Sequence, residues 1–402
     1  MLQPLQSGPL APHLDSFAAL LVQQRYCSVT GWNKLRLVAD LSNWMVQRKL
    51  QLDDLNEQQV AKFFNWRWQR VVYHSGDKCT LAHLLQHLRQ LDIVPPPRSA
   101  PLTPIDMIER DYGHHLRQER GFMSGSVGQY LTVARRFLWH RFRDGKLRLK
   151  ELGTKDVSDF VLKDSAIRGR RSAQLMTSVL RSFLNYLFQE GQAATNLATA
   201  IPATAGGRLS ELPRYLDAAQ VEKLLRSCDR RHGVGRRDYA VLVLLARLGL
   251  RASEVANLEL DDIDWTVGEL IIRGKGNRVD RMPLLQEVGK AVADYLKRGR
   301  PRCSTRHVFV HCKAPYAGFS SPPSAVSSIV NRALARAGLN PQNHGAHLLR
   351  HSLATNLLRC GASLTQIGQV LRHQQMQTTE IYAKVDVNAL RALAQPWPGG
   401  AQ

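Results

Sequence analysis

The chain has 402 residues, with 55 Lys and Arg against 33 Asp and Glu, and therefore a formal net charge of +22 at pH 7. This length allows two or three domains of ordinary size, each with its own hydrophobic core. Basic pairs such as Arg135-Arg136, Arg230-Arg231 and Arg236-Arg237 occur along the whole chain. Their spread predicts a long surface that follows the phosphates of a nucleic acid, because an extended polyanion is the partner that such a charge favours.

The same composition argues against several other classes of protein. The six cysteines include no C-x-x-C pair, so their scatter fits reduced thiols rather than a disulfide framework. The longest apolar run, Ala240 to Ala246, is too short to cross a bilayer, and the N-terminus lacks the pattern of a secretion signal. No zinc-site spacing is present among His311, Cys312, His344, His347 and His351. The sequence predicts a soluble cytoplasmic protein without a membrane span or a metal site.

Residues 1–202 are predicted to form two helical modules. Apolar residues recur at helical spacing between residues 14 and 93, which predicts a small all-helical unit over residues 1–100. The proline-rich segment 95–101 stops any helix and extends the backbone, so it is a predicted linker. The same plan recurs over residues 103–202, which end in a second break of small residues at 201–208.

The two modules match each other at an offset of 97 residues. The segment from Lys49 to Leu55 aligns with that from Lys146 to Leu152, and the same offset pairs Phe63 with Phe160. We interpret the match as an internal duplication, although the shared residues are mostly of the apolar kind that any helical bundle needs.

Residues 210–395 are predicted to form an α+β domain. An apolar helix over residues 238–248 ends at Gly249, and Arg251 follows where a new helix begins and loose backbone N–H groups can share an anion with it. Alternating residues on both sides of a glycine-rich turn predict a β-hairpin with Lys275 at its tip. The predicted fold class is therefore mainly α with a small β component: helical N-terminal modules followed by an α+β domain.

The C-terminal part of this domain brings polar residues together by helical spacing. His347 and Arg350 are three residues apart on a predicted helix, which places both groups on one face. A second predicted helix over residues 364–371 delivers His373 just beyond its end, and a third short helix carries Tyr382. This spacing predicts a nucleophile beside groups that bind phosphate.

Six polar residues occur in a fixed order and context: Arg251, Lys275, His347, Arg350, His373 and Tyr382. This set resembles the tyrosine recombinase family, which includes the phage-type integrases and the Xer-like resolvases, and the resemblance covers at least residues 210–395. It implies a site-specific DNA recombinase that cuts and rejoins strands through a covalent 3′-phosphotyrosyl intermediate, for integration, excision or transposition of a mobile element. It places residues 103–202 as the SAM-like core-binding domain and residues 1–100 as an added module of the same kind.

The resemblance also implies the partners of the protein. These are double-stranded DNA at specific recombination sites and further copies of the chain, as a tetramer on synapsed DNA, with or without sister recombinases. No cofactor and no metal ion is implied, and the location would be the bacterial cytoplasm, in association with the nucleoid.

Phosphoryl transfer explains why these residue types occur together. The transition state places extra charge on the non-bridging oxygens of the phosphodiester, so its catalysis is mainly charge stabilisation and positioning. Guanidinium groups remain charged and offer a planar fork to phosphate oxygens, which makes Arg251 and Arg350 the expected clamp. His347 and His373 are expected to complete it as hydrogen-bond donors, and His347 can accept the tyrosine proton.

The remaining roles follow from the resemblance. It makes Tyr382 the nucleophile, Lys275 the general acid that protonates the leaving oxygen, and Glu254 a supporting residue that orients a basic partner. One departure is visible, because the chain has Arg372 before His373 where many relatives have glycine. We expect this additional side chain to lie beside DNA.

Two other functions use part of the same pattern. A type IB topoisomerase employs similar chemistry, but the tandem helical modules and the tail after the tyrosine favour recombination. A non-catalytic DNA-binding accessory protein would be expected to lack one or more of the six residues. A covalent adduct on a denaturing gel after incubation with DNA distinguishes the enzymes from a protein that only binds.

Overall fold

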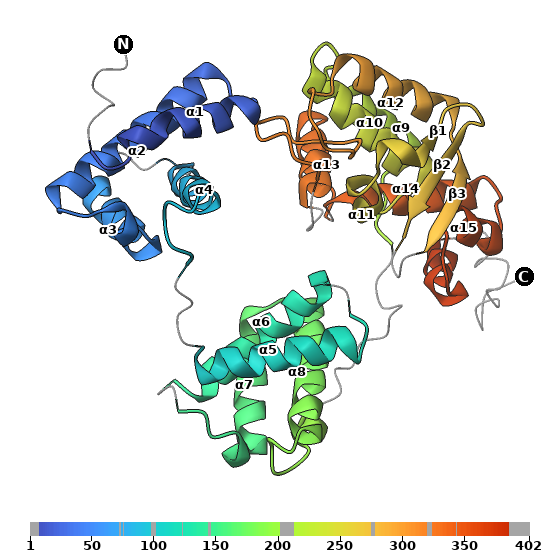
Figure 1. Cartoon of the computed structure of the whole chain (residues 1–402). Coiled ribbons are helices and arrows are strands. Elements are labelled where there is room, and N and C mark those ends of the chain that lie inside the picture. Colours follow the sequence, from blue (N-terminus) through green and yellow to red (C-terminus); the bar gives the residue numbers. More distant parts are fainter. Residues whose placement is uncertain are drawn as a thin grey trace, which may run out of the picture. The chain divides into compact units, whose positions relative to one another are not determined.

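The computed structural model describes residues 8–71, 74, 76–97, 102–122, 124–143, 146–201, 213–274, 278–319, 324–342 and 344–385. Their buried apolar residues gather in three segments of the chain, residues 10–94, 105–201 and 216–382 (Figure 1). The predicted fold class is confirmed, because the described elements are mostly helices with a sheet of three short strands. Among the described residues, no helix combines the length and apolar composition that crossing a membrane requires.

The first segment contains four α-helices that surround one core. They are α1 (Leu14–Gln23), α2 (Ser28–Gln47), α3 (Glu57–Trp68) and α4 (Asp77–Gln90), with short 3-10 helices at Ala11–His13 and Leu52–Asp54. Asn56 starts α3, since its side chain accepts hydrogen bonds from the backbone N–H groups of Gln58 and Gln59. The apolar residues at helical spacing on α4, Leu81, Leu84, Leu85 and Leu88, are all buried, so helical periodicity predicted this core.

The second segment has the same succession of elements and belongs to a compact unit of its own, residues 98–210. Its helices are α5 (Pro104–Gln118), α6 (Ser124–Arg141), α7 (Thr154–Ile167) and α8 (Arg170–Gln189), with 3-10 helices at Leu149–Glu151 and Leu197–Ala200. Thr103 and Asp106 form a reciprocal capping box at the start of α5.

The elements of these two segments recur in register. The 3-10 helices that begin at Leu52 and Leu149 are 97 residues apart, and α3 and α7 begin at the same offset. Phe63 and Phe160, which this offset pairs, are both buried. Around this 3-10 helix and the α-helix that follows it, the two segments therefore have the same secondary structure and bury the paired phenylalanine, which supports a proposal of duplication.

The third segment contains the remaining helices and the sheet. Its elements are α9 (Ala218–Arg226), α10 (Gly233–Leu248), α11 (Ala252–Ala256), a 3-10 helix at Leu260–Asp262, β1 (Ile263–Asp264), β2 (Glu269–Arg273), β3 (Val279–Pro283), α12 (Gln286–Arg298), α13 (Ser324–Arg336), α14 (Ala346–Arg359), α15 (Leu364–Val370), and 3-10 helices at Met376–Thr378 and Glu380–Val385. The strands form an antiparallel sheet in the order β1-β2-β3, with Arg273 opposite Val279. The predicted hairpin is thus present.

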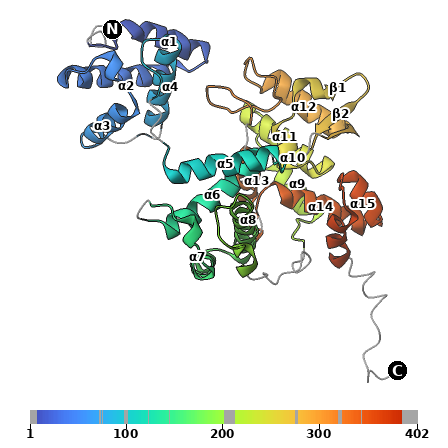
Figure 2. The ribbon, with the colours of Figure 1, turned by 60° about the horizontal axis from the view of Figure 1, so that its bottom comes forward.

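Helix α10 is the centre of this segment. All residues from Ala240 to Ala246 are buried, and α10 packs against α9, α12, α13 and α14 (Figures 1 and 2). The apolar run that is too short for a membrane therefore forms the middle of a core. The helix starts at Gly233, five residues before the predicted start, because its first turns are polar and the sequence pattern begins only where the helix becomes buried.

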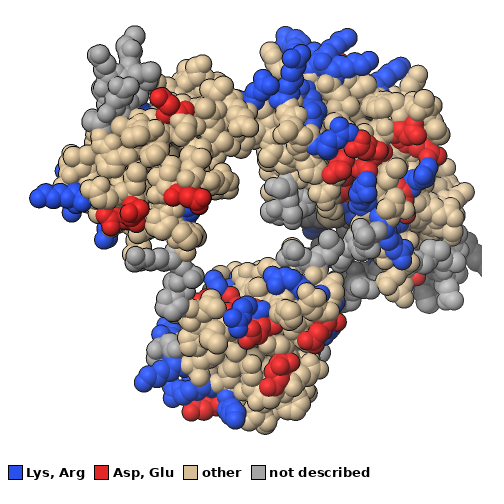
Figure 3. All heavy atoms as spheres, in the orientation of Figure 1, with Lys and Arg blue, Asp and Glu red and all other residues tan. Residues whose placement is uncertain are grey.

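The charged side chains are distributed over each part of the molecule. Figure 3 shows Lys and Arg side chains on the visible face of all three segments, with Asp and Glu side chains among them. This mixture agrees with an excess of positive charge that is not confined to a tail.

Candidate active site

The turn after α10 sets the position of Arg251. Gly249 adopts a left-handed conformation with φ of 60°, and a Cβ atom on it would lie 2.8 Å from Leu371 Cδ2 and 3.0 Å from Leu353 Cδ2. Only glycine fits this close approach without a shift of its neighbours. The chain then turns so that Arg251 is the N-cap residue of α11. Its backbone N–H donates to Glu254 Oε2 at 2.8 Å.

Arg350 comes from the second turn of α14 and reaches two other elements. Its side chain is buried, and its two terminal nitrogens donate hydrogen bonds to the backbone oxygens of Gly249 and Leu371. These oxygens belong to the ends of α10 and α15, whose last carbonyls have no partner within the helix. Arg350 therefore connects α14 with the ends of α10 and α15, next to the turn that leads to Arg251.

Glu254 is a buried carboxylate that bonds two arginines. Its Oε1 lies 2.7 Å from Arg251 Nη1, and its Oε2 lies 2.6 Å from Arg372 Nη2. Burial raises the pKa of this carboxyl group, but Arg372 and Arg251 outweigh the burial and hold its pKa below the ordinary value. Glu254 is therefore charged, and it orients Arg251, whose side chain remains 34% exposed.

Arg372 differs from the expectation that its side chain lies beside DNA. The side chain is only 8% exposed and turns inward to Glu254, with its Nε 3.7 Å from Asp280 Oδ2. Its backbone has φ of 55°, a left-handed conformation that costs a residue other than glycine on the order of 1 kcal/mol. The inward turn has an electrostatic reason: Glu254 is a buried carboxylate that attracts this guanidinium.

His373 and Tyr382 are held by a short turn and a 3-10 helix after α15. Ser363 is the N-cap residue of α15, and its side chain forms a capping box with Gln366. His373 Nδ1 lies 2.7 Å from Thr379 Oγ1, and Thr379 is fully buried. The pair fixes the orientation of the imidazole ring, which then presents its other nitrogen away from Thr379.

Tyr382 is almost completely buried and its hydroxyl has a histidine partner. The side chain packs in a small cluster with Ala354, Ile367 and Leu371, and it is 2% exposed. His351 Nδ1 lies 2.9 Å from the phenol oxygen. Burial raises the pKa of Tyr382 to about 12, although Arg350 acts in the opposite direction. The phenol is therefore protonated in this structure and needs a base and a nearby positive charge to react.

Two of the six predicted residues, His347 and Lys275, remain predictions. His347 lies in the first turn of α14, one turn before Arg350, and its side chain is exposed. Lys275 lies outside the described residues, between Gly274 and Arg278, the residues that close the β2–β3 hairpin by a backbone hydrogen bond of 2.8 Å. The structure brings together Arg251, Glu254, Arg350, His373 and Tyr382.

The positive charges of this cluster exceed its negative charges. Burial and then the proximity of Arg251 lower the pKa of Arg350 to about 10. Burial, Arg350 and Arg251 also lower the pKa of His373 to about 4, so this imidazole is neutral at pH 7. Groups that repel each other's charge in this way stabilise an anion, and a phosphate would relieve the repulsion. In the described part of the chain, no three His, Cys, Asp or Glu side chains gather as a metal site does.

Comparisons with known proteins show which family the chain resembles. The sequence profile of the phage integrase family matches residues 214–389. The chain is 43% identical to the integrase/recombinase y4rA of Sinorhizobium fredii over 98% of its own length and 96% of that protein. It is 31% identical to tyrosine recombinase XerD of Mycobacterium tuberculosis over 72% of its length and 95% of that protein.

The chain belongs to the phage integrase family of tyrosine recombinases. Solved structures of this family have the same fold. The XerH recombinase bound to its palindromic difH substrate matches 75% of this chain with a TM-score of 0.56 and 19% identity. The integrase of transposon Tn1549 in complex with circular intermediate DNA matches 72% of it with a TM-score of 0.54 and 18% identity. The matches cover 99% of each of those two chains.

The structure adds three residues to the site of this recombinase. His351 bonds the Tyr382 hydroxyl, Arg372 bonds Glu254, and Thr379 bonds His373. In the sequence, His351 is a polar residue directly after Arg350 on the same predicted helix. This position could have indicated a role in the site. Thr379 has no such signal, because a threonine in a short polar segment is ordinarily exposed.

Proposed function

We propose that this tyrosine recombinase is a site-specific DNA recombinase in which Tyr382 attacks the scissile phosphate. The observation that supports the proposal most directly is the convergence of Arg251, Arg350 and His373 on the neighbourhood of Tyr382, from elements that are far apart in the sequence. A buried phenol surrounded by an excess of positive charge is an arrangement for binding and attacking a phosphodiester.

The chemistry proceeds by exchange of one phosphoester for another. The phenol oxygen of Tyr382 forms a bond to phosphorus, the bond from phosphorus to the 5′ oxygen of the next nucleotide breaks, and a 3′-phosphotyrosyl enzyme results. Lys275 protonates the leaving oxygen, and the phenol proton passes to a neighbouring imidazole. His351 Nδ1 is hydrogen-bonded to that phenol, so it is the nearest acceptor. A 5′ hydroxyl from another strand reverses the step without an external energy source.

The clamp on the phosphate consists of Arg251 and Arg350, with His347 and His373 as further hydrogen-bond donors. Arg251 is the more exposed of the two arginines, and Glu254 holds its guanidinium in one orientation. Arg350 is fixed by the carbonyl oxygens of Gly249 and Leu371. Preoriented donors of this kind cost little reorganisation when charge develops on the phosphate.

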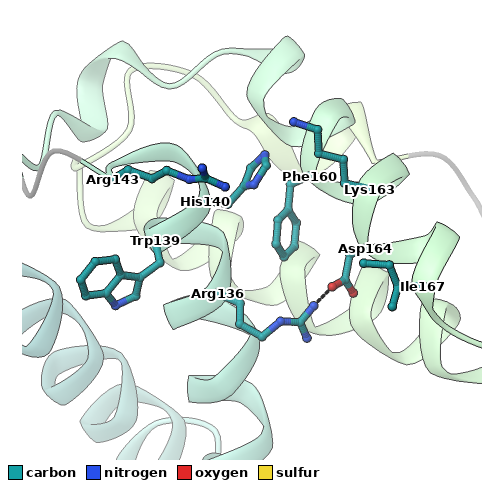
Figure 4. Close-up of a pocket in the computed structure, with 8 residues that line it drawn as sticks. All are labelled: Arg136, Trp139, His140, Arg143, Phe160, Lys163, Asp164 and Ile167. Carbon is teal, nitrogen blue, oxygen red and sulfur yellow. Dashed lines mark ion pairs between the residues drawn. The ribbon is translucent and has the colours of Figure 1, made fainter.

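The domain organisation is also a proposal. Residues 210–395 form the catalytic domain, residues 103–202 the core-binding domain, and residues 1–100 a second module that arose by duplication. A groove of about 570 Å³ between α6 and α7 supports DNA binding by the core-binding domain. Figure 4 shows the cations Arg143 and Lys163 at this groove and the ion pair of Arg136 with Asp164. The Trp139 side chain there is 54% exposed.

The added module has a groove in the corresponding place, between α2 and α3. Its volume is about 500 Å³, and Arg48, Lys62, Trp44 and Trp66 line it together with polar amide groups. The lining of this groove includes no acidic side chain. Basic groups beside tryptophan rings suit the phosphates and bases of DNA, so we assign this module additional contacts outside the core site.

The biological setting follows from the relatives. Names such as integrase/recombinase and transposon integrase support a role in the integration, excision or transposition of a mobile element. Several solved relatives are DNA complexes, among them a dimer of lambda integrase bound to a core site. We therefore propose a homo-oligomer, a tetramer on synapsed DNA, that acts in the cytoplasm at the nucleoid.

The decisive test is a trap for the covalent intermediate. The purified protein is incubated with a labelled duplex that carries the junction between the element and its flanking DNA, nicked next to the cleavage position, and the products are separated in SDS. We expect a labelled adduct at the 3′-phosphate end that the break creates, and exchange of strands between two such duplexes. Relaxation of supercoiled DNA without strand exchange would indicate a topoisomerase, and the absence of any adduct would indicate an accessory protein.

A further inference from the structure

Arg372 connects three parts of the catalytic segment. Its guanidinium bonds Glu254 on α11 at 2.6 Å, and it donates to Met282 Sδ and lies 3.7 Å from Asp280 Oδ2. Asp280 and Met282 belong to β3, where they lie on the same face because side chains alternate along a strand. Arg372 itself directly precedes His373. The buried Arg372 side chain therefore contacts Glu254, which orients the clamp residue Arg251, and it also contacts strand β3 of the hairpin. Both contacts come from the turn that precedes His373.

The backbone conformation at this position is unfavourable for arginine. The residue has φ of 55°, which glycine adopts without strain and arginine does not. The side chain is also buried, and a buried cation without a partner is strongly unfavourable. Its cost is offset by the bond to Glu254, which is itself buried. A residue held in this way against two penalties points to a specific role.

The same ion pair reaches the end of the hairpin that carries Lys275. A Cβ atom on Gly274 would lie 4.0 Å from Glu254 Oε1, so the carboxylate adjoins the last residue before Lys275. Gly274 donates a backbone hydrogen bond of 2.8 Å to Arg278 across the hairpin. Glu254 thus lies beside Gly274, the residue that follows β2, and Arg372 contacts β3.

We propose that Arg372 is a positioning residue that fixes the β2–β3 hairpin against the clamp and thereby places Lys275 for protonation of the leaving oxygen. Arg372 acts through Glu254 and β3 and does not itself bind the scissile phosphate. The inference rests on the proposed function, since it uses the assigned role of Lys275.

The test compares cleavage of two substrates by Arg372→Gly. Glycine suits the left-handed backbone, so the variant is expected to fold, and only the side-chain contacts are lost. On ordinary DNA its single-turnover cleavage should be slower by about a hundredfold, which is the usual size of a general-acid contribution. On DNA whose bridging 5′ oxygen is replaced by sulfur, which needs no proton to leave, its rate should return to within about threefold of wild type. Arg372→Lys, which keeps one bond to Glu254, should have an intermediate defect.

A matched control variant and a measurement without DNA separate this positioning role from a general loss of activity. Arg281 also lies on β3, but it is 73% exposed and pairs with Glu269, so Arg281→Ala should cleave both substrates normally. Hydrogen exchange of residues 269–283 should become about tenfold faster in Arg372→Gly, because a buried tie to the hairpin is lost.

Three results would overturn the inference. They are equal defects on both substrates, normal cleavage of ordinary DNA, and unchanged hydrogen exchange in the hairpin. Failure of the proposed function is recognised separately, since the wild type would then form no adduct with either substrate, whereas the exchange measurement needs no DNA.

Discussion

Replacement of Tyr382 by phenylalanine removes the proposed nucleophile and little else. The side chain is 2% exposed and its ring packs against Ala354, Ile367 and Leu371, which are contacts that a phenyl ring retains. Only the hydroxyl is lost, together with its hydrogen bond to His351. The variant should therefore bind its site with unchanged affinity and form no covalent complex, because no other atom replaces the phenol oxygen.

The size of the effect on stability follows from the same contacts. A single buried hydrogen bond contributes about 1 kcal/mol net, so Tyr382→Phe should lower the free energy of unfolding by about that amount. Tyr382→Ala would also remove the ring and should cost about 3 to 5 kcal/mol, as large core truncations do. A loss of activity in the phenylalanine variant is thus separable from a loss of folding.

The assay is the SDS-resistant adduct on a nicked, labelled duplex, with urea unfolding measured on the same preparation. Tyr295→Phe is the matched control, since Tyr295 is equally buried but packs against Phe309 in the main core of the segment. It should form the adduct at the wild-type rate. An adduct that survives in Tyr382→Phe, or one that is lost equally in Tyr295→Phe, would refute the assignment.

Further predictions concern the clamp, the general acid and the neutral histidine. Arg251→Lys and Arg350→Lys should each reduce cleavage about a hundredfold or more, because one ammonium group cannot reproduce the planar fork; near-normal rates would exclude the clamp. Lys275→Ala should be slow on ordinary DNA and recover on the substrate with bridging sulfur, and equal defects would exclude a general acid. His373 has a folded-state pKa of about 4, mainly through burial and then Arg350, against about 6.5 unfolded. The unfolded state therefore binds more protons between these values, so the free energy of unfolding should fall as the pH drops from 6.5 to 4. Urea titrations at pH 7 and pH 5 should show a smaller difference for His373→Gln than for the wild type.

The sequence was sufficient for those parts of the molecule whose signal is local. The helical periodicity of α4, the end of α10 at Gly249 and the N-cap at Ser363 all depend on neighbouring residues, and each is present in the structure. The ordered motif also named Arg251 and Tyr382, because the family resemblance depends on their context. Local chemistry and family resemblance together predicted the fold class and the outline of the site.

Two of the contacts that the sequence did not reveal, those of Arg372 with Glu254 and of His351 with Tyr382, are long-range. Arg372 was expected beside DNA, because it adds a side chain where many relatives have glycine, but it bonds Glu254, which lies 118 residues earlier in the chain. The imidazole that bonds Tyr382 belongs to His351, although the motif directed attention to His347 for the tyrosine proton. Periodicity places a residue on a face of its own helix, but only the packing of several helices decides which distant group it meets.

The last prediction concerns residues 1–100, whose function rests on the repeated plan and on the groove between α2 and α3. If Arg48 and Lys62 in this groove contact DNA, each contact releases counterions when DNA binds. A protein that starts at Leu102 should then bind more weakly, and its slope of log affinity against log salt should be shallower by about 0.9 for each lost phosphate contact. Cleavage on a pre-assembled site should persist, since no residue of the proposed site is removed.

Point variants test the same idea without removing the module. Arg48→Gln combined with Lys62→Gln should reduce the salt slope by about 1.8, because two contacts are lost, whereas Arg25→Gln should leave it unchanged, since Arg25 is exposed and does not line the groove. Both slopes are measured with one protomer on a single half-site. A module that instead contacts a neighbouring subunit would leave the slope of the groove variant and of the shortened protein at the wild-type value, and only assembly on paired sites would fail. An unchanged slope would therefore refute DNA binding by this groove.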